Sequence, residues 1–263
     1  MGSGGQGQGS RSSGEASPAA RNLVKERQLC LAALVSLVVF AGSPWASDVD
    51  LAMGERRERM VREQIQARGV KDPRVLEAMR RVPRHMFVPP SVASKAYQDS
   101  PLPIGHGQTI SQPFIVAYMC EALGLEGHEK VLEIGTGSGY HAAVLSLLAR
   151  EVYTIEILEP LADEARERLQ VLGYDNVTVV CGDGYQGLAQ QAPFDAIVVT
   201  AAPPEIPQEL MRQLKTGGRM VVPVGEGTQE LLRITRTEQG ARVERLLPVR
   251  FVPMVPGGQN RSR

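Results

Sequence analysis

The feature that most restricts the fold of this chain is an alternation of apolar segments with helical stretches across residues 130–225. The apolar segments are bounded by turn residues and lack the alternating polar positions of a half-exposed strand. Strands that are apolar on both faces and alternate with helices are typical of a parallel sheet covered on both sides. The sequence therefore predicts a doubly wound, mostly parallel α/β fold with strands at 130–134, 151–157, 176–183, 194–202 and 219–225, and helices at 140–149, 159–172 and 205–214.

Helical patterns also precede this region. Residues 55–70 have apolar side chains near helical spacing, and Gly69 is a typical C-terminal stop. Asp72 followed by Pro73 is an N-cap and first-turn signal for a second helix over residues 72–82. We therefore expect two helices before the sheet begins.

Two further segments lie outside the alternating pattern. Residues 97–113 are rich in Pro and Gly, show no periodicity and are too long for a simple connection, so we expect a functional loop there. Residues 114–125 then return to helical spacing. Residues 230–251 are expected to form two strands joined by a turn near Gln239 and Gly240, which predicts an antiparallel C-terminal edge to the sheet.

The N-terminal residues differ from the rest in composition. Residues 1–52 are predicted to be a disordered extension, because the first part is rich in Gly, Ser and Gln. Within it, residues 29–46 form an apolar segment of the length of a secretory signal core and short for a membrane span. A cleaved signal, an uncleaved anchor and a translation start at Met53 all remain open. We expect the folded domain at 53–258 and a short tail at 259–263.

Charge and cysteine content indicate which partners are not expected. The 263 residues contain 29 Lys plus Arg and 29 Asp plus Glu, so no overall attraction to nucleic acid or to an anionic membrane is expected. Cys30, Cys120 and Cys181 form no CxxC pair at zinc spacing with histidines. The sequence therefore predicts no nucleic acid partner and no metal, and membrane contact only if 29–46 is an uncleaved anchor.

A glycine-rich turn follows the predicted strand 130–134. Gly135, Gly137 and Gly139 make a GxGxG pattern that opens a helix at Tyr140. The dinucleotide fingerprint GxGxxG requires its third glycine at the position of this tyrosine. A nicotinamide dinucleotide is therefore disfavoured as the ligand of the turn.

Acidic residues lie at or near the ends of three successive predicted strands. Glu133 is placed to accept from a bound ligand or its waters, Glu156 to accept from ribose hydroxyls, and Asp183 beside Gly184 to meet an adenine edge. The pattern includes no Lys or Arg that could bind a phosphate group. This pattern favours a nucleoside ligand without phosphates, and S-adenosylmethionine fits it. The alternative is a tight strand-helix turn whose neighbouring carboxylates only cap helices or face solvent.

Several segments resemble the protein-L-isoaspartate (D-aspartate) O-methyltransferase family. They are VLEIGTGSGYHAAVL, GQTISQPFIVAYM, FDAIVVTAAPPEIP, MVVPVG and RFVPMV, and the resemblance covers residues 55–257. It implies a Rossmann-like, class I S-adenosylmethionine-dependent methyltransferase. Such an enzyme transfers a methyl group to the α-carboxyl of L-isoaspartyl residues in damaged proteins, and the ester then collapses to a succinimide on the way to repair.

The resemblance also implies roles for individual residues. Ser111 matches the active-site serine, which makes it the candidate catalytic and substrate-binding residue, and Val252 and Pro253 match a substrate-facing strand near the C-terminus. His141 stands where the family commonly has glutamine. The candidate cofactor-binding residues are Thr109, Ile110, Glu133, Gly135, Thr136, Gly137, Ser138, Gly139, Glu156, Asp183, Gly184 and Thr200.

Elementary chemistry agrees with this assignment. An α-carboxyl has a pKa of about 3.3 to 3.7, so the isoaspartyl carboxylate is already an anionic nucleophile and needs no general base. Ser111 is then expected to orient the carboxylate, although a serine just before Pro113 could also only cap the next helix. A methyltransferase for another carboxyl or a small molecule, and a non-enzymatic cofactor-binding module, remain the alternatives. We expect a cytoplasmic enzyme, or a periplasmic or membrane-anchored one if 29–46 acts as a signal.

Overall fold

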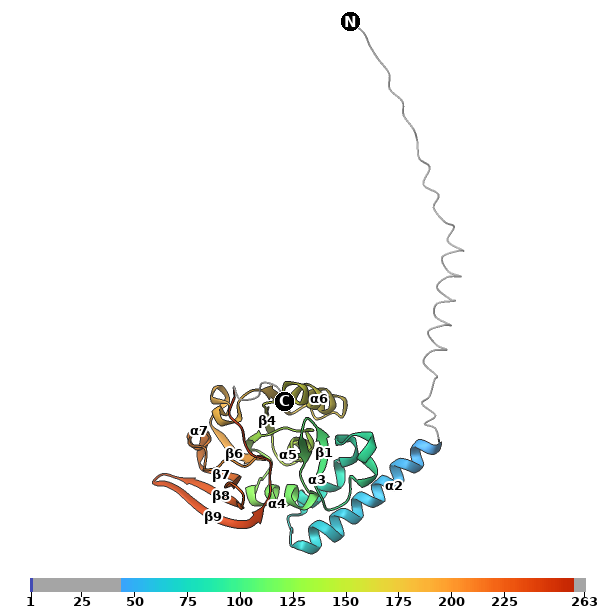
Figure 1. Ribbon diagram of the computed structural model, residues 1–263, viewed down its shortest axis with the longest axis horizontal. Coiled ribbons are helices and arrows are strands. Elements are labelled where there is room, and N and C mark those ends of the chain that lie inside the picture. The colour runs from blue at the N-terminus through green and yellow to red at the C-terminus, as the bar shows by residue number, and fades with distance from the viewer. Residues whose placement is uncertain (2–43, 258–263) are drawn as a thin grey trace. The chain divides into compact units, whose positions relative to one another are not determined.

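The computed structural model describes Met1 and residues 44–257 (Figure 1). The chain divides into two units, Met1–Asp50 and Leu51–Arg263, and the second contains the sheet. Most of the predicted 1–52 extension, and the 259–263 tail, lie outside the described residues. Residues 44–52 form the first part of helix α2 (Pro44–Met60). None of the helices in the described part of the chain combines the length and the apolar character needed to cross a membrane.

A seven-stranded sheet organises the described residues, in the order β5-β4-β3-β6-β7-β8-β9. The pairs from β5 to β7 are parallel, whereas β8 and β9 add antiparallel pairs at one edge. The predicted doubly wound α/β sheet with an antiparallel C-terminal edge is confirmed. The strands are β3 (Lys130–Ile134), β4 (Glu151–Glu156), β5 (Val177–Cys181), β6 (Phe194–Val199), β7 (Leu214–Val224), β8 (Gln229–Thr237) and β9 (Gly240–Val249).

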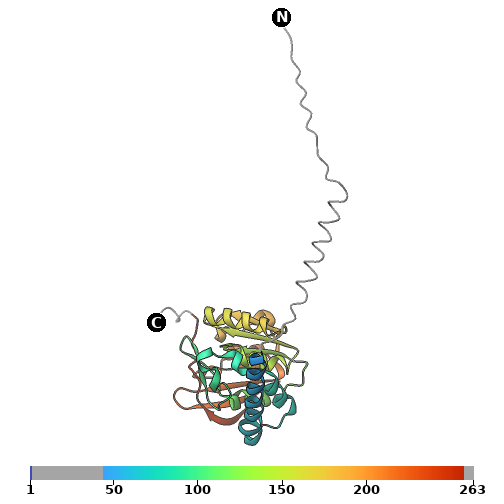
Figure 2. The ribbon, with the colours of Figure 1, turned by 90° about the vertical axis from the view of Figure 1, so that its right-hand side faces the viewer.

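Helices cover both faces of this sheet (Figures 1 and 2). Successive residues of β3 enter different cores, because Val131 packs in one apolar cluster and Leu132 and Ile134 pack in another. The first cluster includes residues of α3, α4, α5 and α6, and the second includes α7. The bounds are α3 (Pro73–Arg81), α4 (Pro113–Leu123), α5 (Tyr140–Ser146), α6 (Glu159–Val171) and α7 (Gln208–Gln213), with 3₁₀ turns η5 (Gly184–Gln186) and η6 (Ala189–Gln191).

The two helices predicted before the sheet are present. The first is α2, which continues as a π-helical turn η1 (Val61–Ile65) and a 3₁₀ turn η2 (Gln66–Arg68). It stops at Gly69, whose φ of 100° is left-handed. The carboxylate of Asp72 accepts hydrogen bonds from two backbone N–H groups of the first turn of α3, as its N-cap position predicts.

The segment predicted as an irregular loop differs from that expectation. Residues 97–113 contain a short antiparallel hairpin, β1 (Leu102–Gly105) and β2 (Gln108–Ile110). It is preceded by 3₁₀ turns η3 (Arg84–Phe87) and η4 (Pro90–Lys95). Strands of three and four residues present too few alternations to produce a recognisable periodicity, which is why the sequence did not reveal the hairpin.

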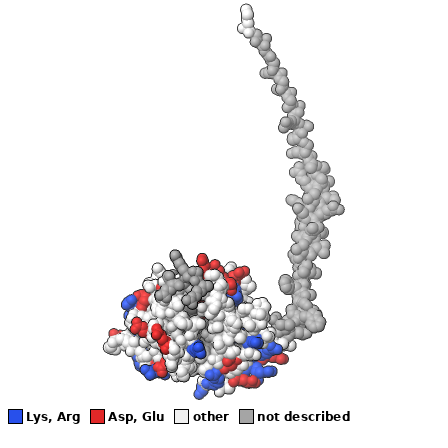
Figure 3. Space-filling model, viewed as in Figure 1, with Lys and Arg blue, Asp and Glu red and all other residues white. Residues whose placement is uncertain are grey.

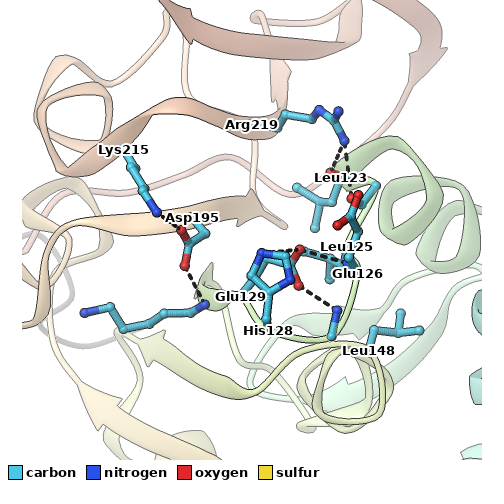
Figure 4. A network of polar contacts seen from close by, with 12 residues as sticks. Leu123, Leu125, Glu126, His128, Glu129, Leu148, Asp195, Lys215 and Arg219 are labelled. Carbon is cyan, nitrogen blue, oxygen red and sulfur yellow. Dashed lines mark hydrogen bonds and ion pairs between the residues drawn. The ribbon is translucent and has the colours of Figure 1, made fainter.

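Polar contacts hold the N-terminal ends of β3 and β6 (Figure 4). Asp195 accepts from the backbone N–H of Lys130 at 2.9 Å and from Lys215 Nζ at 2.8 Å. Glu129 accepts from two backbone N–H groups of the preceding turn, both at 2.8 Å. Arg219 donates to the carbonyl that ends α4. We call these residues, which lie opposite the glycine turn, the lower network.

Charges of both signs are interspersed on the face shown in Figure 3. The described surface on that side therefore follows the balanced composition of the whole chain, which has a formal net charge of zero. Within the described residues, no group of three or more His, Cys, Asp or Glu side chains is arranged to hold a metal ion.

Candidate active site

A cavity of about 360 Å³ lies at the C-terminal ends of the central parallel strands. This is the edge where doubly wound sheets bind ligands, and the volume lies within the usual range for a small-molecule site. Its walls come from the β1–β2 hairpin, the loop before α4, the glycine turn and the segment after β9. The predicted site residues that line it are Thr109, Ile110, Ser111, Gly135, Thr136, Gly137, Ser138, Glu156, Gly184, Thr200, Val252 and Pro253.

The glycine turn packs directly against Thr200, which follows β6. Gly135 has a φ of 95°, and a Cβ atom at this position would lie 2.4 Å from Thr200 Oγ1. The same hydroxyl donates to the carbonyl oxygens of Ile134 and Gly135, at 3.0 and 2.7 Å. Only glycine therefore fits here, and the turn leaves its backbone open to close approach by a ligand.

Glu156 ends β4 and is pinned by the backbone. Its side chain is almost fully buried, at 6% exposure, yet it lines the cavity. Oε2 accepts from the N–H of Gly137 at 2.8 Å and Oε1 from the N–H of Leu158 at 3.1 Å. Since a carboxylate has about four acceptor sites, each oxygen can still accept from a ligand hydroxyl.

Glu133 does not line the cavity, although the sequence predicts that it lies beside the ligand. Its side chain is fully buried, and Oε2 accepts from the hydroxyl of Thr154 at 2.6 Å. Thr154 in turn lies 2.7 Å from the hydroxyl of Thr136, which does line the cavity. Glu133 is therefore linked to the glycine turn through two hydroxyls rather than placed beside the ligand.

Burial makes Glu133 and its neighbour His141 neutral. Desolvation raises the pKa of Glu133 to about 8, the hydrogen bond from Thr154 opposes this shift, and the charge of Glu156 adds to it. Desolvation lowers the pKa of His141 to about 3. Although His141 Nδ1 lies 3.6 Å from Glu133 Oε1, the pair therefore carries no charge near neutral pH. The other ring nitrogen lies 3.3 Å from Cys120 Sγ.

Asp183 and Gly139 also lie outside the cavity lining, unlike Gly184. The two oxygens of Asp183 accept from the N–H groups of Tyr185 and Gly257, both at 2.9 Å, so the carboxylate ties the segment after β9 to the start of η5. Gly184 lines the cavity, and a Cβ there would meet Ile134 Cγ2 at 2.4 Å. This glycine keeps the cavity open.

Ser111 follows β2 and faces the cavity with a free hydroxyl. The N-cap residue of α4 is Gln112, and no side chain caps that helix. Among the described residues, one side chain bonds Ser111: the guanidinium of Arg84 donates from Nη2 to the backbone carbonyl of Ser111 at 2.7 Å. The capping role that the sequence left open is therefore absent, and the hydroxyl is available to a ligand.

The segment after β9 is not a strand of the sheet. It is extended and makes a single parallel bridge, in which Pro253 pairs with Ala202. The N–H of Ala202 donates to the carbonyl of Val252, and the N–H of Met254 donates back to Ala202, both at 2.8 Å. These contacts place Val252 and Pro253 in the cavity wall.

Sequence reasoning missed part of the lining. The sequence predicts neither the hairpin nor its tip, and it indicates Tyr140 only as the first residue of a helix at the place of a third glycine. The sequence signal that could have indicated Tyr140 as a lining residue is an aromatic at the first position of the helix that follows a glycine turn. The missed lining residues include His106, Gly107, Gln108, Tyr140, Ile157 and Leu158.

Comparisons with known proteins agree with this geometry. The model of the family Protein-L-isoaspartate(D-aspartate) O-methyltransferase matches residues 55–259. A protein-L-isoaspartate O-methyltransferase of Synechococcus sp. is 55% identical over 220 residues, which is 81% of this chain and 90% of that protein. One from Gloeobacter violaceus is 58% identical over 197 residues, 74% of this chain and 96% of the other.

Solved structures give the same result. A protein-L-isoaspartate O-methyltransferase has a TM-score of 0.69 at 32% identity, covering 75% of this chain, which spans 65% of that longer one. A putative protein-L-isoaspartate O-methyltransferase from Plasmodium falciparum, in complex with S-adenosyl-L-homocysteine, has a TM-score of 0.65 at 26% identity and covers 76% and 98% of the two chains. The chain belongs to the protein-L-isoaspartate(D-aspartate) O-methyltransferase family.

Proposed function

We propose that this cavity holds S-adenosylmethionine beside the α-carboxylate of an L-isoaspartyl residue, and that Ser111 orients the carboxylate for methyl transfer. The activity is that of a protein-L-isoaspartate O-methyltransferase, the family to which the chain belongs. The observation that carries the residue assignment is the meeting, in one cavity, of the free Ser111 hydroxyl with the glycine turn and Glu156.

The cavity fits the cofactor on three counts. The glycine turn admits no side chain at Gly135, so a ligand can lie against its backbone. Glu156 presents a carboxylate with acceptor capacity to spare for ribose hydroxyls. Among the described residues no Lys or Arg lines the cavity, which suits a nucleoside without phosphates. When bound, S-adenosylmethionine supplies an electrophilic methyl group on a sulfonium.

The substrate side of the cavity needs to position an anion rather than activate it. The isoaspartyl α-carboxylate is ionised at neutral pH, so no general base is required. The Ser111 hydroxyl donates to one carboxylate oxygen and fixes the direction of the other. Val252 and Pro253 supply an apolar wall and exclude water. Catalysis then comes mainly from proximity, alignment and desolvation.

The substrates are proteins or peptides that contain L-isoaspartyl residues, with the methyl ester leading to a succinimide. Transfer of radiolabelled methyl to an isoaspartyl peptide and to its aspartyl twin tests this, with base release of methanol identifying a carboxyl ester. The wild-type enzyme is expected to label only the isoaspartyl peptide. Labelling of neither peptide, with the cofactor still bound, would contradict the substrate assignment.

Ser111→Ala tests the role of the hydroxyl. The variant is expected to lose about tenfold to a hundredfold in kcat/KM for the isoaspartyl peptide, because one orienting hydrogen bond to a charged group is lost. Its Kd for S-adenosylhomocysteine should stay within about twofold of wild type. Unchanged turnover in Ser111→Ala would remove Ser111 from the mechanism.

A cytoplasmic location follows from the cofactor, which is made and kept in that compartment. The apolar segment 29–46 is the sequence feature that opposes this proposal. Cell fractionation, with N-terminal sequencing of the mature chain, tests it. A chain recovered from the periplasm and beginning near residue 47 would contradict a cytoplasmic location.

A further inference from the structure

A fully buried arginine lies behind the Ser111 loop. Arg84 begins η3 and has no exposed surface. Its guanidinium donates from Nε to the carbonyl of Ala96 at 2.8 Å and from Nη2 to the carbonyl of Ser111 at 2.7 Å. The side chain therefore ties the proposed carboxylate-binding loop to the segment that follows η4.

The charge of Arg84 has no ion-pair partner among the described residues. Nη1 is buried and makes no hydrogen bond. Asp99, the carboxylate that interacts electrostatically with Arg84, forms an ion pair with Arg68 through Oδ2 at 2.7 Å, and its buried Oδ1 makes no hydrogen bond. Burial lowers the pKa of Arg84, and Tyr140, Tyr97 and Asp99 partly offset this shift. An arginine nevertheless keeps its proton in proteins, so the guanidinium remains a cation.

Holding two carbonyl groups does not explain a buried cation. A neutral donor could bond the same oxygens without the large desolvation penalty of an unpaired charge. Arg74 shows the ordinary arrangement, because it donates to the carbonyls of Leu125 and Leu148 but remains partly exposed. The position of Arg84 therefore calls for a second use of its charge.

That use is indicated by the neighbours of the guanidinium. It contacts two residues that line the cavity, Ser111 through its carbonyl and Tyr140 through its ring, 4.8 Å from the ring centroid. Another arginine, Arg168, also donates to a lining residue, but it is partly exposed and lies 3.9 Å from the carboxylate of Glu164. The unpaired positive charge thus lies on the side of the cavity that carries Ser111.

We propose that Arg84 is a positioning residue that fixes the Ser111 loop and gives this side of the cavity the positive potential that selects an ionised α-carboxylate. The inference rests on the proposed role of Ser111. Arg84 would then determine the specificity for the substrate carboxylate from behind the cavity wall, without contacting the substrate.

The proposal separates two effects on catalysis. The charge stabilises the bound carboxylate, and methyl transfer neutralises that carboxylate, so loss of the charge weakens substrate binding more than it lowers kcat. The two hydrogen bonds order the loop, so their loss lowers kcat. A variant that keeps a donor but loses the charge should therefore raise KM with a smaller change in kcat.

The test compares binding of two peptides to the full-length enzyme saturated with S-adenosylhomocysteine, by calorimetry. One peptide contains L-isoaspartate, and the other contains L-isoasparagine, the same linkage with a neutral α-carboxamide. Wild type is expected to prefer the anion by roughly tenfold, typical of one nearby charge at intermediate dielectric. Arg84→Gln, which keeps a donor without the charge, is expected to bring the preference close to one. Arg84→Lys, measured at pH 6, is expected to keep it.

Arg74→Gln is the matched control, because it removes a similar two-carbonyl contact away from the cavity, and it should keep the wild-type preference. A wild-type enzyme that does not discriminate between the peptides would overturn the proposal without any variant. Equal weakening of both peptides in Arg84→Gln would also overturn it, since that is the signature of a purely structural role. Failure of wild type to methylate the isoaspartyl peptide would instead overturn the proposed function.

Discussion

The two ends of strand β3 carry carboxylates in opposite states. Glu129 lies just before the strand in the lower network, where burial alone would raise its pKa but backbone N–H groups lower it overall. Glu133, near the other end, has its pKa raised to about 8 by burial, and one of its oxygens lacks a hydrogen-bond partner. One end of the strand thus stabilises a charge, and the other end tolerates a polar group that is poorly solvated.

This difference extends to the neighbouring residues. In the lower network Asp195 is paired with a cation and a backbone N–H group. Around the cavity, Arg84 Nη1 and the Ser111 hydroxyl have no partner within the described residues. Of these two groups, the Ser111 hydroxyl lines the cavity, where a ligand can supply the missing hydrogen bond, whereas Arg84 lies behind the cavity wall. The lower network, by contrast, is expected to contribute to stability alone.

The largest effect is expected from adding a side chain to the glycine turn. Gly135→Ala places a Cβ against Thr200 in a left-handed backbone conformation, so cofactor binding and kcat/KM should fall by about a hundredfold or more. Gly69→Ala is the control, because its φ of 100° is similar but no atom lies within 4 Å of the added Cβ. This control should lose about 1 kcal/mol of stability and retain cofactor affinity. Equal losses of cofactor affinity in the two variants would attribute the effect to backbone strain.

The second effect concerns the pH dependence of stability. The folded pKa of Glu133, about 8, lies above its unfolded value of about 4.3, so the proton is bound more tightly in the folded state. The stability it contributes is complete below the unfolded pKa and is lost as pH rises from about 4.3 through 8. Glu133→Gln should therefore gain stability relative to wild type between pH 5 and 8, by more than about 1.4 kcal/mol, the equivalent of one pKa unit.

Glu129→Gln provides the opposite case for the same denaturant titration. Because the folded pKa of Glu129 is lowered, its contribution is present above its unfolded pKa and is lost as pH falls through the folded one. The stability difference between this variant and wild type should therefore shrink in acid and stay constant between pH 5 and 8. A Glu133→Gln difference that is also flat over that range would show that Glu133 is ionised in the folded state.

A smaller effect is expected in the lower network. Asp195→Asn keeps an acceptor for the N–H of Lys130 but loses the ion pair with Lys215, so unfolding should become easier by about 0.5 to 1 kcal/mol. At a temperature where both proteins are folded, kcat/KM for an isoaspartyl peptide should not change. A lower kcat/KM with unchanged stability would contradict the separation between the two ends of the sheet.

The local parts of this comparison could be predicted from the sequence, and the long-range parts could not. The glycine turn follows β3 and Glu156 ends β4, the next strand along the chain, and the structure places both at the cavity. The contact of Arg84 with Ser111 joins residues 27 positions apart and leaves no periodic signal. The neutral state of Glu133 depends on burial and on Thr154, which reaches it from the neighbouring strand.

The smallest effect is expected at His141, the position where the resemblance implies glutamine. Because desolvation lowers the pKa of His141 to about 3, the ring is neutral throughout the working range and a neutral amide can replace it. His141→Gln should change the Kd for S-adenosylhomocysteine by less than about threefold, and this Kd should not vary between pH 5.5 and 8 in either protein. A wild-type Kd that weakens or tightens around pH 6.5, with a flat profile in the variant, would show that the ring titrates. It would then be a charged His141, facing Glu133 at 3.6 Å, that sets the electrostatics beneath the turn.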